Sequence, residues 1–236
     1  MKGWYPSNKE ELQKLLKEFL KKNVKRKVNG ILVPHAGYYY SGEIAGEAFC
    51  FLKNTPNKKA IVIGPNHYFQ IRGIFSHNEE YWKTPLGKIK IRENNFKKID
   101  ISIEHSIDNQ IPFLQFLNFE EVFPIMLSDL SFEEINELSR ILSKEEGVFV
   151  FSSDLSHFLS YEEAIKKDKE TIRAVENLDE RYFLKERDSA CGILPILLMI
   201  TLSKLKGWKP RLVSYKNSGD LTLDKKSVVG YASFIF

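Results

Sequence analysis

The sequence predicts an α/β domain with a mainly parallel central sheet flanked by helices. Two features carry this prediction. Short runs such as "AIVIGP" (60–65) and "GVFVFSS" (147–153) are apolar on both faces, as parallel strands covered by helices are. These runs alternate with amphipathic segments of helical spacing. The chain shows no internal repeat, low-complexity tract or linker, so residues 1–236 are expected to form one domain.

The first half of the chain supplies a helix, a strand, a second helix and a second strand. Residues 7–22 have leucines at helical spacing, with Ser7 as the expected N-cap and Glu10 three residues later. "VNGILVP" (28–34) reads as a short buried strand and "SGEIAGEAFCFLK" (41–53) as a helix. "KKAIVIGP" (58–65) is the clearest strand, and residues 68–92 are expected to form a small hairpin-like excursion.

The second half continues the alternation. Strands are expected at 120–127 and 147–153, with a helix at 131–143 between them that opens on Ser131. Helices are expected at 161–177 and about 193–204, and two strands, 209–217 and 227–236, close the chain.

Composition narrows the function classes. Of 236 residues, 43% are hydrophobic and 13% aromatic, enough for a large core. The net charge of +4 is small, so nucleic-acid binding is not expected. The first twenty residues are too charged for a signal peptide, and the longest apolar stretch, 191–202, is too short to cross a membrane. Two cysteines exclude a disulfide framework. We expect a cytoplasmic protein without a membrane partner.

Three histidines follow expected strands. His35 comes after "GILVP", His67 after "AIVIGPN" and His157 after "GVFVFSSDLS". His105, in "EHSID", directly precedes an expected helix start, whereas His77 has no such position and is expected on the surface. Because open α/β sheets bind ligands at the carboxyl ends of their strands, we expect these imidazoles to line a ligand crevice.

Cys191, in "RDSACGILP", is expected at or just before a helix start, where backbone N–H groups favour a thiolate. The helix can begin with Ser189 as cap or with Pro195 as its first residue, and the sequence does not decide between them. Two imidazoles and a thiolate make a three-donor metal site with open positions. An inert buried thiol is the alternative for Cys191 and the preferred interpretation of Cys50.

Carboxylates accompany the histidines. Asp154, three residues before His157, can orient an imidazole or accept its proton, or simply cap a helix. Glu104 and Asp108 lie near His105, where Ser106 is the expected cap, and an acid–base role and a capping role are both open there. Tyr38, Tyr39 and Tyr40 either wall the pocket or pack beneath a loop.

Six motifs occur in order along the chain: "VPHAGYYYSG", "IGPNHY", "KTPLG", "EHSIDNQIPFLQ", "SSDLSHF" and "ACG", preceded by "GWYP". Together they resemble the ordered motifs of the Memo family over essentially the whole chain. The resemblance implies a fold similar to that of the class III extradiol, non-haem iron dioxygenases. Bacterial and archaeal members are often called AmmeMemoRadiSam system protein B, which implies a link to AMMECR1-like and radical-SAM proteins.

Carried over to this sequence, the resemblance places the metal ligands on His35, His67 and Cys191. His105, His157 and Asp154 are the expected catalytic positions, and Tyr38, Tyr40, Asn66 and Asp108 the expected substrate-binding ones. Asp108 stands where many members have Glu. Iron or copper is the expected metal, with zinc as a further candidate, because a thiolate replaces the carboxylate of extradiol enzymes.

Three functions are compatible with these residues. The preferred one is a metal-dependent oxidoreductase of unknown small-molecule substrate. The second is a non-catalytic adaptor that binds a peptide or protein in the same pocket. The third, metal-independent chemistry by Cys191 with a histidine and Asp154, ranks last because it leaves the other histidines without a role.

Overall fold

The computed structural model describes residues 3–56 and 58–236. The central layer is a mixed sheet with the strand order β10-β11-β1-β8-β2-β7-β3-β6. Its strands are β1 (Gly30–Val33), β2 (Lys59–Pro65), β3 (Gly73–His77), β4 (Tyr81–Thr84), β5 (Gly87–Ile91), β6 (Lys97–Ile99), β7 (Glu121–Ser128), β8 (Val148–Ser152), β9 (His157–Leu159), β10 (Arg211–Asn217) and β11 (Val228–Ile235).

The middle of the sheet is parallel and its two sides are mixed. β1, β8, β2 and β7 are consecutive parallel neighbours. β11 joins β1 in antiparallel orientation, and so does β3 with β7. The expected α/β class with a largely parallel sheet is therefore present. The two final strands were placed correctly along the chain and form the antiparallel pair β10–β11.

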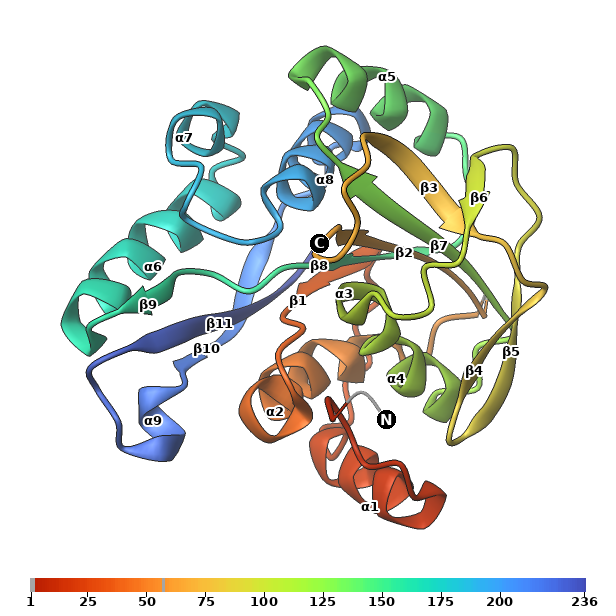
Figure 1. Ribbon diagram of the computed structural model, residues 1–236, viewed down its shortest axis with the longest axis horizontal. Helices are drawn as coiled ribbons and strands as arrows, with labels where there is room; N and C mark the ends of the chain where they lie inside the picture. The colour runs from red at the N-terminus through yellow and green to blue at the C-terminus, as the bar shows by residue number, and fades with distance from the viewer. Residues whose placement is uncertain (1–2, 57) are drawn as a thin grey trace.

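Helices cover both faces of the sheet (Figure 1). They are α1 (Lys9–Phe19), α2 (Tyr38–Phe49), α3 (His105–Asp108), α4 (Ile111–Phe116), α5 (Phe132–Leu142), α6 (Tyr161–Glu176), α7 (Glu180–Lys185), α8 (Ile193–Lys206) and α9 (Gly219–Thr222), with a 3-10 turn at Cys50–Leu52. In the figure, α1 to α4 lie on one side of the sheet and α5 to α8 on the other.

The alternation of side chains along each strand separates two cores. Ile31, Val62 and Val150 pack with α1, α2 and α4, whereas Leu32 and Ile63 pack with α5 and α8. Because successive side chains point to opposite faces, a strand between two helical layers must be apolar throughout. This is why β1, β2 and β8 read as continuous hydrophobic runs.

Several local expectations need correction. Asn8, and not Ser7, caps α1, and its side chain accepts the N–H of Glu11. His77 is buried against Trp82, with ring centroids 4.9 Å apart, so the expectation that it lies on the surface was wrong. Ser131 caps α5 as expected, in a capping box with Glu134. In the described part of the chain, no helix combines the length and the apolar character needed to span a bilayer.

A close approach of α3 to β2 fixes the position of His105. The Ser106 hydroxyl donates to the carbonyl of Pro65 at 2.7 Å. A Cβ added to Gly64 would stand 2.3 Å from that Ser106 oxygen and 3.0 Å from the Ile107 side chain. Only glycine leaves room for the helix at this point.

We therefore expect Gly64→Ala to push α3 away from β2 and to destabilise the protein by about 1–3 kcal/mol, the usual cost of overpacking a core. Urea unfolding measures this change. Gly37→Ala is the control, because its Cβ would meet its nearest neighbour at an ordinary 3.5 Å. Equal stability of the two variants would contradict the account.

Candidate metal centre

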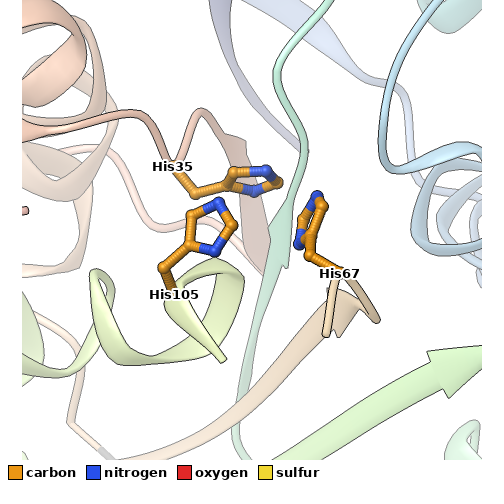
Figure 2. Close-up of side chains that lie close together, drawn as sticks. All are labelled: His35, His67 and His105. Atoms are coloured by element: carbon orange, nitrogen blue, oxygen red, sulfur yellow. The ribbon is translucent and has the colours of Figure 1, made fainter. Parts of the chain in front are cut away.

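Three histidines converge at the carboxyl edge of the parallel strands (Figure 2). His35 follows β1, His67 follows β2, and His105 is the first residue of α3. One nitrogen from each ring lies within 4.8 Å of the other two. The strand order brings the first two together, since β8 alone separates β1 from β2. Sequence reasoning predicted this meeting of strand ends.

The geometry suits a metal ion. Three nitrogen donors on one ion stand about 3.4–3.6 Å from one another, given a metal–nitrogen bond of about 2.1 Å. The three histidine nitrogens lie within 4.8 Å of one another, so an inward movement of about 1 Å or less by each ring would let them share an ion. Burial, reinforced by the neighbouring rings of His67, His105 and His157, lowers the pKa of His35 well below its ordinary value. The neutral imidazole that results is the form that binds metals.

Glu104 orients the ring of His67 and lies beside that of His105, whose Nδ1 is 2.9 Å from the Tyr68 hydroxyl. One of its carboxylate oxygens lies 2.9 Å from Nδ1 of His67 and 3.4 Å from Nδ1 of His105, and the other accepts the backbone N–H of His67. Because a carboxylate can only accept, the Nδ1 of His67 carries the proton and its Nε2 is left for a ligand. Burial alone would raise the pKa of Glu104, but the bonds from His67 and Ser106 outweigh it and hold the pKa below its usual value.

Glu104 is also the N-cap of α3, where its side chain accepts the N–H of Ser106. The expected cap, Ser106, instead bonds to β2. Sequence reasoning noted Glu104 only as one carboxylate near His105. Its position directly before the histidine of "EHS" is the signal that could have identified it as a residue that supports the histidine cluster.

Asp154 fixes the backbone that follows β1. The carboxylate is buried and accepts the backbone N–H groups of His35 at 2.7 Å and of Ala36 at 3.3 Å. Burial, opposed by these bonds, raises its pKa to about 6. Asp154 therefore fixes the backbone that carries His35 and is not a helix cap.

The side chains of three further polar residues complete this support. Nδ1 of His35 lies 2.8 Å from the Ser152 hydroxyl, which also accepts from the Gln110 amide. The amides of Gln110 and Asn109 donate to the carbonyls of Pro34 and His35. Sequence reasoning missed Ser152, Asn109 and Gln110, although two amides in the buried segment "EHSIDNQ" were a signal that backbone groups needed partners there.

Cys191 contacts His35 directly. Its sulfur lies 3.1 Å from Nε2 of His35 and accepts the backbone N–H of Asp154 at 3.3 Å. α8 begins two residues later, at Ile193 with Gly192 as N-cap, which agrees with the helix expected at about 193–204. Ser189 is therefore not its cap, and Pro195 is its third residue and not its first. The helix start was expected to favour a thiolate, but burial, with the charge of Asp154, raises the pKa of the thiol. A thiolate at this position would therefore need a positive charge beside it, such as a bound metal ion.

His157 reaches the same cavity, of about 440 Å³, that His35, His67, His105, Asp154 and Cys191 line. Its Nδ1 lies 2.8 Å from the carbonyl of Leu155. A carbonyl can only accept, so Nδ1 holds a proton and the Nε2 of the neutral ring is left as a proton acceptor. His157 is the first residue of β9, which pairs with β11.

The expected substrate-binding residues separate into two groups. Tyr40 lines a cavity beside the histidines. The other three hold the fold: Tyr38 is buried and donates to the carbonyl of Asn109, Asp108 accepts from Tyr5 and Trp82, and the Asn66 amide donates to Phe69 and Ser128. The tyrosine run thus divides, since Tyr38 packs in the core, Tyr39 is exposed and Tyr40 faces the cavity.

Trp4 covers His105 from the start of the chain. The two rings stack with centroids 4.3 Å apart and an interplanar angle of 8°. The Trp4 carbonyl accepts the N–H of Tyr38, and Tyr5 donates to Asp108 at 2.9 Å. The "GWYP" segment is therefore part of the site.

The model of the Memo-like protein family matches residues 3–235. The chain belongs to the Memo family. It is 35% identical to a MEMO1 family protein of Aquifex aeolicus, over 99% of this chain and 96% of that protein, and equally identical, with the same coverage, to one of Methanobrevibacter smithii. A MEMO1 family protein of Thermoplasma acidophilum is 33% identical, over 98% of this chain and 95% of the other.

Within this family member, Glu104 offers the sharpest test of the metal centre. We expect Glu104→Gln to weaken metal binding by about 10–100-fold, because the carboxylate that fixes the ring orientation and tautomer of His67 is lost while all three histidines remain. Calorimetric titration with Zn²⁺ measures the affinity. Glu134→Gln, on the exposed start of α5, is the control and should bind as the unaltered protein does. Unchanged affinity in Glu104→Gln would contradict the assigned role.

Proposed function

We propose that this Memo-family protein is a metal-dependent oxidoreductase that holds iron or copper at the carboxyl edge of its sheet. The observation that carries the proposal is the convergence of His35, His67 and His105 within 4.8 Å, with the Cys191 sulfur 3.1 Å from His35. Imidazole together with a soft sulfur donor suits copper, iron and zinc, and disfavours magnesium or calcium.

His35 and His67 are the donors common to every arrangement that we consider. Cys191 contacts His35, and His105 lies against His67 with ring centroids 4.4 Å apart. Both are further donors in the proposal. A thiolate would also offset the positive charge of the ion, which three neutral imidazoles leave unbalanced.

The protein's own groups supply binding and proton transfer. A bound iron or copper ion would supply the redox chemistry. His157, with Nδ1 held by Leu155, is placed to accept a proton from a ligand in the shared cavity. The carboxylate of Asp154 lies in the same cavity, where its charged form would stabilise positive charge on the neighbouring His157 or His67 ring. Neither residue needs to touch the ion for these roles.

The test is metal content after anaerobic loading with Fe²⁺, Cu⁺ and Zn²⁺ in competition. We expect about one iron or copper per chain in the unaltered protein and less than about a tenth of that in His35→Ala or His67→Ala, because removing one donor of a small ligand set removes most of the affinity. Cys191→Ser should favour harder ions than the unaltered protein does. The bound ion should change oxidation state reversibly with dithionite and ferricyanide.

Two controls separate the site from general damage. His77→Gln removes a buried histidine that lies outside the cluster, and Cys50→Ala removes the other thiol. Both should keep full metal content. Bound zinc alone, or metal content that is unaffected by His35→Ala, would refute the oxidoreductase proposal and favour an adaptor that uses the same pocket.

A further inference from the structure

A second cavity, of about 560 Å³, opens beside the histidine cluster. We call it the Tyr40 groove. His105, Asp154 and His157 line both this groove and the histidine cavity, so the two adjoin. Its far wall comes from the segment between β10 and β11, which contributes Ser218 and Asp224. A ligand that occupies the groove can therefore also contact the histidines.

The groove is aromatic on the side of the N-terminal segment. Trp4 and Tyr40 line it, and Tyr231, on β11, is a buried part of its lining. One face of Trp4 is stacked on His105, which fixes the plane of the indole. Tyr40 is 39% exposed although it lies in a helix that is otherwise largely buried. Flat aromatic surfaces of this kind attract rings and cations.

The groove is also acidic, in a chain with an excess of basic residues. Among its described lining residues are the carboxylates of Asp154 and Asp224, and none is Lys or Arg. The whole chain, by contrast, has 35 Lys and Arg against 31 Asp and Glu. The lysine that follows Asp224 is directed elsewhere, because Lys225 Nζ lies 4.3 Å from the ring centroid of Tyr161. A carboxylate or phosphate at this end would meet like charge and no cation to bind it.

We infer that the Tyr40 groove binds an aromatic amine, with its ring against Trp4 and Tyr40 and its ammonium group at Asp224. The inference rests on the proposed function only in that the ring end of the ligand would then adjoin the metal centre. The preference for a cation comes from Asp224 and the aromatic walls, and so it holds with or without metal.

Three probes of one size separate charge from shape: tyramine, 4-ethylphenol and 4-hydroxyphenylacetate. They share a phenol ring and differ in carrying a positive, no or a negative charge. We expect tyramine to bind about tenfold more tightly than 4-hydroxyphenylacetate, with 4-ethylphenol between them. An exposed carboxylate and an aromatic face together supply about that much preference for a cation over an anion. Ligand-observed NMR titration at constant salt measures the three dissociation constants.

Matched variants locate the effect. Asp224→Asn should weaken tyramine binding by roughly threefold or more and leave 4-ethylphenol unchanged, since only the charge interaction is removed. Asp129→Asn, the same charge change at a residue outside the groove, should alter neither. Tyr40→Ala should weaken all three probes, whereas Tyr39→Ala, whose neighbouring ring is outside the groove lining, should not.

The titrations are run on apo and zinc-loaded protein, with metal content measured on the same samples. An amine preference in protein that binds no metal would support the groove assignment while refuting the metal proposal. Stoichiometric metal with equal affinities for the three probes, or with tighter binding of 4-hydroxyphenylacetate, would refute the groove assignment alone. Failure of all three probes to bind would also overturn it.

Discussion

The site depends on one buried carboxylate. Glu104 is fully buried and accepts bonds from the backbone and ring of His67 and from the first turn of α3. It joins the end of β2 to the start of the helix that carries His105, and it sets which nitrogen of His67 is left for a ligand. A buried carboxylate without such donors would cost several kcal/mol, roughly, so its bonds and the histidine geometry are maintained together.

The parallel centre of the sheet brings together the segments that carry the histidines. Because β1, β8 and β2 run side by side, the loops that follow them meet at one edge. Asp154, after β8, bonds the backbone that follows β1, and Ser152, the last residue of β8, meets the ring of His35. Gln110 and Asn109 then satisfy the carbonyls of the same loop. The histidine geometry and the local stability of the fold therefore rest on the same polar contacts.

Sequence patterns predicted the central strands and the residues that follow them. The apolar runs located the central strands, and the residues that follow β1 and β2 were expected at the site because parallel strands end at a common edge. Contacts between distant segments left no such pattern. Trp4 stacks on His105, about a hundred residues away in the sequence. Ser106 bonds to β2 instead of capping α3 as expected. His77 is buried against Trp82. Only the assembled fold determines which polar group meets which.

X-ray absorption at the edge of the bound metal would test the central claim most directly. The account predicts a shell of histidine nitrogens, with multiple scattering from at least two imidazole rings, and one sulfur neighbour that is lost in Cys191→Ser. His35→Ala and His67→Ala should leave no such spectrum. A bound ion surrounded only by oxygen neighbours, or a spectrum that is unchanged when His35 or His67 is removed, would show that the metal lies elsewhere and would contradict the account.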